Sequence, residues 1–273
     1  MRAGDQRKDG GNEKIVETIS GYFKVPESFE DMVYLSQVSQ ALAMKTSIEF
    51  WRSVKPRCMG TLYWQLNDTW PVASWSSLEY GGHWKVTQYM ARRFHNPVLV
   101  TAQPDTVTGD IVLWAVNDTP DAVSPSISMT RVDVAGPMAT VGTFACVCPP
   151  NKAVEVARIA ATNIAAQEFL SFKWQDVDGK HSGQNDYLPN RPKEYDLRTP
   201  KITAVEAGDT VTLTCDVPAL YVTLNHGSAD IYSDNGFTWL PDIEKVITIT
   251  RKRGTAGAAP PSMVTSIKYL NAS

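Results

Sequence analysis

The chain has 273 residues, enough for one large domain or for two to three ordinary domains. Hydrophobic residues make up 43% of it and charged residues 20%, a balance typical of a globular protein with substantial cores. A formal net charge of −3 excludes the basic surplus of proteins that bind nucleic acid or anionic lipid, and no apolar run approaches the roughly 18 residues of a membrane-spanning helix. We therefore expect neither a nucleic acid nor a membrane as a partner.

Residues 27–52 carry the spacing of a helix. Ser28 is a candidate N-terminal cap, with Pro26 just before it and Asp31 three residues after it. Apolar residues then recur at intervals of three and four, at Met32, Leu35, Val38, Ala41, Leu42, Met44, Ile48 and Trp51. The pattern predicts one long helix.

A short aromatic run follows at residues 59–68, between Pro56 and Pro71, and it predicts a buried strand. Residues 84–94 come after a Gly-Gly break and predict a second helix. Helix, strand, loop and helix in this order indicate the end of an α/β unit.

From about residue 95 the pattern changes to short alternating runs separated by turn residues. Such runs predict strands of an antiparallel sandwich at 97–102, 110–116, 126–134 and 169–175. The alanine-rich residues 150–168 predict further strands and a turn.

A polar stretch with three prolines, 188–200, is interpreted as a linker. Beyond it, a second sandwich is predicted from runs at 201–205, 210–217, 220–224 and 245–251, and residues 252–262 are expected to fray. The chain is thus divided into parts 1–95, 96–197 and 198–273.

The four cysteines are Cys58, Cys146, Cys148 and Cys215. Cys146 and Cys148 are too close for the usual Cys-x-x-Cys metal or redox spacing, and no histidine cluster accompanies them. We interpret the cysteines as buried structural thiols, with metal or disulfide chemistry as the alternative. Since the sequence also lacks a phosphate-binding glycine loop, we expect no cofactor.

The densest mixture of aromatic and polar side chains lies at residues 60–75. Sugars bind such mixtures, because their C–H faces stack on aromatic rings while their hydroxyl groups need directional polar partners. On a strand, Leu62, Trp64, Leu66 and Asp68 share one face. The alternative is that these tryptophans pack in a core beside the leucines.

Residues 59–85, MGTLYWQLNDTWPVASWSSLEYGGHWK, resemble the last barrel strand and the following loop of β-mannosidases of glycoside hydrolase family 2. Residues 29–41 and 49–53 resemble the helix before that strand, and residues 89–94 resemble the helix after it. Residues 232–237, YSDNGF, resemble the last sandwich domain of the same enzymes.

The resemblance implies a mixed fold: the end of a (β/α)8 catalytic barrel over 1–95, then two immunoglobulin-like antiparallel β-sandwich domains over 96–197 and 198–273. It also implies retaining exo-hydrolysis of terminal β-D-mannosides, which uses two carboxyl groups about 5 Å apart. The family places both glutamates on earlier barrel strands. Asn12-Glu13 lies too near the Trp64 strand to be one of them. Residues 10–15 instead resemble the stretch that follows the nucleophile strand, so Met1 is interpreted as an internal methionine of a longer enzyme.

We therefore expect an inactive fragment whose partners are a β-mannoside substrate and the upstream part of the same enzyme. One strand cannot close a barrel of about 250 residues, so Leu62 and Leu66 are expected to be exposed. Trp64 matches the tryptophan that ends the last barrel strand in this family, and it is therefore expected to contact mannose. Gln65, Asn67, Asp68 and Trp70 are expected to shape the substrate-binding mouth, and Asp68 is not expected to be catalytic.

Two alternatives stay open. Another exo-glycosidase of the same family, such as an exo-glucosaminidase, a β-galactosidase or a β-glucuronidase, shares much of this pattern. A non-catalytic carbohydrate-binding or scaffold module is the second, with Trp114, Trp174 and Trp239 as candidate binding residues. Asn117-Asp-Thr and Asn271-Ala-Ser are interpreted as glycosylation sequons in form only.

Overall fold

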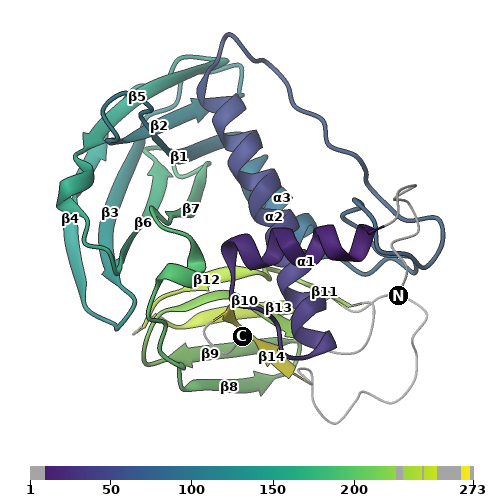
Figure 1. Cartoon of the computed structure of the whole chain (residues 1–273). Helices are drawn as coiled ribbons and strands as arrows, with labels where there is room; N and C mark the ends of the chain where they lie inside the picture. Colours follow the sequence, from purple (N-terminus) through teal and green to yellow (C-terminus); the bar gives the residue numbers. More distant parts are fainter. Residues whose placement is uncertain (1–9, 226–229, 242, 251–265, 271–273) are drawn as a thin grey trace. The chain divides into compact units, whose positions relative to one another are not determined.

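The computed structural model describes residues 10–225, 230–241, 243–250 and 266–270 (Figure 1). The predictions for Met1, for residues 252–262 and for the Asn271 sequon lie outside the described residues. The chain forms two compact units. Unit 1 comprises Met1–Ala43, Tyr63–Met90 and Leu197–Ser273, and unit 2 comprises Met44–Leu62 and Ala91–Asp196.

Three α-helices occur in the described part: α1 (Gly11–Tyr22), α2 (Phe29–Ser53) and α3 (Val86–Phe94). The cap predicted for α2 is confirmed, because the Asp31 backbone N–H donates to Ser28 Oγ at 3.1 Å. The helix predicted over 84–94 is also confirmed, and it begins two residues later. Helix α1 was not predicted. Its Ile19 is buried, and Glu13 lies in its first turn. No helix in these ranges is long and apolar enough to cross a membrane.

Unit 2 contains two antiparallel sheets. One has the strand order β1-β2-β5 and the other has the order β4-β3-β6-β7. The bounds are β1 (Val98–Pro104), β2 (Ile111–Asn117), β3 (Pro125–Asp133), β4 (Met138–Ala145), β5 (Lys152–Ile159), β6 (Glu168–Asp176) and β7 (Ser182–Tyr187). Strands β1, β2, β3, β5 and β6 were predicted, whereas the edge strands β4 and β7 were missed.

The two sheets of unit 2 enclose one apolar core. On β3, buried Ile127 and Met129 alternate with exposed Ser126 and Ser128, as a strand with one face toward a core requires. Leu113 and Phe172 are also almost completely buried in this core. The antiparallel sandwich predicted for this region is confirmed.

Unit 1 contains the second pair of antiparallel sheets, with strand orders β12-β10-β14 and β11-β13-β9-β8. The bounds are β8 (Ile202–Ala207), β9 (Thr210–Cys215), β10 (Ala219–Asn225), β11 (Ile231–Tyr232), β12 (Phe237–Trp239), β13 (Lys245–Thr250) and β14 (Ser266–Lys268). Strands β8, β9, β10 and β13 were predicted. Their core includes Tyr89 of α3, whose hydroxyl accepts a hydrogen bond from the Tyr232 backbone N–H at 3.2 Å.

The strand predicted at residues 59–68 does not form. This segment is irregular, and its regular pairing is limited to an isolated bridge between Asn67 and Leu78. A strand needs neighbours for its backbone N–H and C=O groups, and no described strand pairs with residues 59–64. The predicted burial is also wrong: Leu62 is 97% exposed and Leu66 is 58% exposed. The exposure of Leu62 and Leu66 agrees instead with the second expectation, that these side chains stay uncovered in a chain too short to close a barrel.

The predicted linker at 188–200 is irregular except for one short 3-10 turn, Pro192–Glu194.

Candidate functional site

The candidate site lies in residues 63–85 of unit 1, which we call the aromatic segment. Three of its stretches, 65–68, 75–79 and 83–85, are joined by backbone hydrogen bonds. Leu78 N–H donates to Leu66 O at 2.8 Å, and Asp68 N–H donates to Leu78 O at 3.1 Å. Lys85 N–H donates to Ser77 O at 3.0 Å, and α3 begins at the next residue. The segment is therefore irregular but well connected.

Three of the five predicted site residues lie on the first of these stretches, Trp64 lies just before it and Trp70 lies in the bend after it. Trp64 is 70% exposed and Trp70 is 50% exposed, while Asn67 is exposed and Gln65 is half-buried. Exposed indole rings beside amide side chains are the elements of a sugar-binding surface. Asp68 differs from the other four because it is buried.

Asp68 forms an ion pair with Lys85, with 3.2 Å between Oδ2 and Nζ. Its Oδ2 also accepts a hydrogen bond from Ser76 Oγ at 2.7 Å, and its Oδ1 accepts one from Ser74 Oγ. Burial opposes ionisation of Asp68, but the hydrogen bonds from Ser74, Ser76 and Lys85 outweigh burial and lower the pKa of Asp68 below its ordinary value. The group is therefore an ionised carboxylate with internal hydrogen-bond partners.

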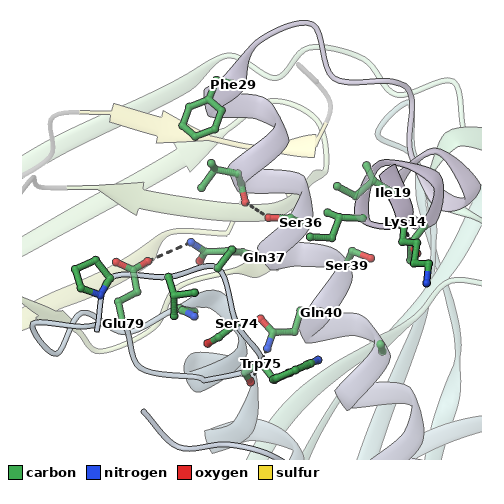
Figure 2. A pocket seen from close by; sticks show the side chains of 18 of the residues that line it. Lys14, Ile19, Phe29, Ser36, Gln37, Ser39, Gln40, Ser74, Trp75 and Glu79 are labelled. Atoms are coloured by element: carbon green, nitrogen blue, oxygen red, sulfur yellow. Dashed lines mark hydrogen bonds between the residues drawn. The ribbon is translucent and has the colours of Figure 1, made fainter. Parts of the chain in front are cut away.

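A pocket of about 750 Å³ lies beside the aromatic segment, between that segment and helices α1 and α2 (Figure 2). Gln40 Nε2 donates to Trp75 O at 2.8 Å, and Gln37 Nε2 donates to Glu79 Oε1 at 3.4 Å. Gln37 Oε1 accepts the Val86 backbone N–H at 3.2 Å, at the start of α3. These glutamines were missed as site residues, although their spacing of three places them on one helix face.

Glu79 is the single carboxylate among the described residues that line this pocket. A retaining glycosidase needs two carboxyl groups, one as nucleophile and one as acid and base. The described residues of the pocket do not supply such a pair. Across the described ranges, His, Cys, Asp and Glu residues form no group of three or more that could hold a metal ion.

Of the three tryptophans proposed for a non-catalytic binding module, Trp114 on β2 is half-buried and the other two are buried in cores. Trp174 is 4% exposed in the core of unit 2, and Trp239 is 3% exposed in the sandwich core of unit 1. Trp239 Nε1 donates to Ile243 O at 2.7 Å. Buried rings of this kind stabilise the sandwiches and are not available to a ligand.

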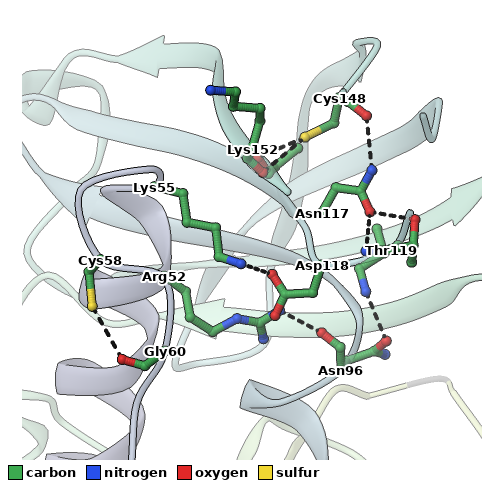
Figure 3. A network of polar contacts seen from close by, with 12 residues as sticks. Arg52, Lys55, Cys58, Gly60, Asn96, Asn117, Asp118, Thr119, Cys148 and Lys152 are labelled. Carbon is green, nitrogen blue, oxygen red and sulfur yellow. Dashed lines mark hydrogen bonds and ion pairs between the residues drawn. The ribbon is translucent and has the colours of Figure 1, made fainter. Parts of the chain in front are cut away.

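A polar network in unit 2 has a structural role (Figure 3). Arg52 near the end of α2 donates to the backbone O atoms of Phe94 and Asn96 and pairs with Asp118 at 3.1 Å. It therefore supplies donors to the carbonyl end of α3, where a cation is favourable. Asn117 is completely buried and its amide donates to Asp121 O and Cys148 O, so this sequon asparagine is structural.

The cysteines match their interpretation in part. All four are free thiols, and Cys148 and Cys215 are buried, whereas Cys58 and Cys146 are half-buried. Burial raises the pKa of Cys148 to about 11.

The chain is similar to known proteins along most of its length. A family model named Ig_mannosidase, described as an Ig-fold domain, matches residues 193–268. The β-mannosidase A of Aspergillus clavatus is 26% identical over 92% of this chain and 30% of its own length. The β-mannosidase of Capra hircus is 43% identical over 40% of this chain and 14% of its own length.

The chain is also similar to a solved β-mannosidase structure. The crystal structure of β-D-mannosidase from Dictyoglomus thermophilum matches 96% of this chain with a TM-score of 0.79 and 25% identity, over 32% of its own length. The chain thus spans less than a third of the length of each of these relatives. In sequence and in fold, the chain is thus similar to the C-terminal portion of β-mannosidases of glycoside hydrolase family 2.

Proposed function

We propose that this chain is part of a retaining exo-β-mannosidase that hydrolyses terminal β-D-mannose residues of oligosaccharides or glycoconjugates. The observation that carries the proposal is the similarity to proteins named β-mannosidase over 92% of the chain. The exposed tryptophans and amides of the aromatic segment support it, because they offer a mannose ring both stacking surfaces and polar partners.

In the proposed architecture, residues 1–95 form the end of a (β/α)8 barrel, and residues 96–197 and 198–273 form two sandwich domains. The order α2, aromatic segment, α3 supports this assignment. Residues 59–68 would gain the strand neighbours that they lack when the other barrel strands lie beside them. The apolar side chains of Leu62 and Leu66 would be covered at the same time.

Within the site, Trp64 is proposed to stack on the terminal mannose. Gln65, Asn67 and Trp70 are proposed to shape the mouth around it. At the carboxyl end of a barrel strand these residues would face the catalytic centre. The exposure of Trp64, Asn67 and Trp70 supports this role, since a ligand can reach all three side chains.

The nucleophile and the acid/base glutamate are proposed to lie in the part of the enzyme that precedes these residues. Glu13 is a poor candidate, because it lies in the first turn of helix α1 and not at the end of a strand. The isolated 273-residue chain is therefore expected to be inactive. Its partner is the rest of the same enzyme.

The proposal is tested by assaying the purified 273-residue chain beside the longest native protein that carries it. Both are given chromogenic β-mannoside, β-glucosaminide and β-galactoside at equal protein concentration, and product stereochemistry is followed by NMR. We expect the longer protein alone to hydrolyse the β-mannoside, with retention. Preference for another glycoside would identify a different exo-glycosidase of the family. Hydrolysis by the short chain would contradict the placement of the glutamates.

A further inference from the structure

Two charged side chains are buried inside the aromatic segment, and the function proposed above gives them no task. Asp68 is 6% exposed and Lys85 is 7% exposed, and their charged atoms are 3.2 Å apart. Burying two charges is unfavourable unless their geometry is good and further hydrogen bonds satisfy the remaining atoms. The surroundings of this pair meet both conditions.

The partners of the pair come from all three stretches of the segment. Asp68 belongs to the first stretch and Lys85 to the third. Ser76, in the second, donates to Asp68 Oδ2 at 2.7 Å and accepts from Lys85 Nζ at 2.8 Å. Ser74, just before the second stretch, donates to Asp68 Oδ1 and accepts the Ser76 backbone N–H at 3.1 Å. One polar cluster thus ties together backbone that is otherwise irregular.

The exposed rings are attached to this cluster through very short lengths of chain. Trp70 lies two residues after Asp68, and Trp75 lies between Ser74 and Ser76. Ser74 and Lys85 also line the pocket beside the segment. Both oxygens of Asp68 already accept internal hydrogen bonds, so its carboxylate is directed toward partners within the segment.

We propose that Asp68 and Lys85 are positioning residues: their buried ion pair holds the aromatic segment in the conformation that presents Trp64 and Trp70, and Asp68 itself does not contact the sugar. The link to substrate rests on the proposed function, whereas the effect on the segment does not. The proposal assigns a structural role to Lys85, which lies just before α3. It also makes Asp68 a residue that positions the segment.

Two measurements on the same variants test the two halves of the proposal. Amide hydrogen exchange of peptides covering residues 64–80 is followed in the 273-residue chain. In the longest native protein, KM and kcat are measured for a chromogenic β-mannoside. The variants are Lys85→Met, Asp68→Asn and the double variant, and the control is Lys268→Met, which breaks a more exposed ion pair with Asp31 in the same unit.

For Lys85→Met we expect exchange of these peptides to be about tenfold faster, because local opening exposes the Leu78 and Ser77 amides. We also expect KM to rise about tenfold with kcat much less changed, because ground-state binding is lost. Asp68→Asn keeps its hydrogen-bond acceptor and should give the same changes to a smaller degree. Lys268→Met should leave both quantities unchanged. If Lys85→Met does not fold, exchange and KM are compared between Asp68→Asn and the Lys268→Met control.

Unchanged exchange in both single variants would overturn the positioning role. Faster exchange with unchanged KM would overturn its link to substrate. A rise in KM for Asp68→Asn but not for Lys85→Met would mean that Asp68 contacts the sugar directly. If the native protein does not hydrolyse the β-mannoside at all, the proposed function fails, and the exchange data still decide whether the pair holds the segment.

Discussion

The sandwich of unit 2 and the aromatic segment of unit 1 are stabilised in different ways. In the sandwich, backbone hydrogen bonds form continuous ladders, and side chains such as Leu113, Ile127 and Phe172 fill one core. In the aromatic segment the backbone pairing is sparse, the large aromatic rings face outward, and the buried centre is polar. A self-contained core makes a scaffold, whereas a polar centre with exposed rings leaves apolar surface free for a ligand or for another part of the protein.

The largest expected effect comes from emptying the sandwich core. Phe172→Ala should lower the free energy of unfolding by about 3–5 kcal/mol, since this ring is 1% exposed and its removal leaves a cavity. The matched change Trp64→Ala removes a ring that is 70% exposed and should have little effect on stability. Urea denaturation of both variants makes the measurement. A large loss for Trp64→Ala would show that its ring packs in a core.

Breaking the polar centre should have the next largest effect. Lys85→Met leaves the Asp68 carboxylate buried without its cation, and a change of this kind costs about 3 kcal/mol. The control is Lys180→Met, whose partner Asp178 and whose own side chain are both exposed, and this change should leave stability unaltered. Equal results for the two lysine variants would contradict the proposed importance of the buried pair.

A smaller effect is expected where two strands approach closely. Gly183 lies opposite Trp174 across β6 and β7, and a Cβ atom there would lie 2.2 Å from the indole ring. Gly183→Ala should therefore destabilise the sandwich by about 2 kcal/mol through overpacking. Gly60→Ala, where no atom lies within 4 Å of the added group, serves as the control in thermal denaturation. An unchanged melting temperature for Gly183→Ala would mean that β7 shifts freely.

The smallest effect is a dependence of stability on pH. Because the pKa of Asp68 is lowered in the folded state, its stabilisation is fully present above the unfolded-state pKa near 3.8 and is lost as the pH falls through the lower folded-state value. Urea denaturation between pH 6 and pH 3, about the range where carboxyl groups titrate, should show a shallower decline for Asp68→Asn than for the unchanged chain. Parallel declines would contradict the ionised state assigned to Asp68.

Local sequence signals predicted the elements that are stabilised locally. The Ser28 cap and the apolar spacing after it identified α2, and the alternation at 126–134 identified β3. Edge strands were harder to recognise. Strand β4 pairs with β3 alone and β7 pairs with β6 alone, and neither contains a buried residue, which leaves the alternation of burial weak in both.

The surroundings of the candidate site depend on partners that the local sequence does not reveal. The composition of residues 59–68 favours a strand, but a strand forms only when neighbours accept its hydrogen bonds. Asp68 was grouped with the other polar residues of the motif because its partner, Lys85, lies 17 residues away in the sequence. The short helix α1 has a narrow apolar face and a glycine at its N-terminal boundary, which are weak helix signals.

The most direct test of the account is the kinetic effect of Trp64→Ala in the longest native protein that carries this chain. If Trp64 stacks on the terminal mannose, kcat/KM for a chromogenic β-mannoside should fall about 100-fold while the urea midpoint stays unchanged. The same substitution in an exposed ring outside the segment, Trp51→Ala, controls for general loss of aromatic area. An unchanged kcat/KM for Trp64→Ala would contradict the claim that the aromatic segment faces the substrate.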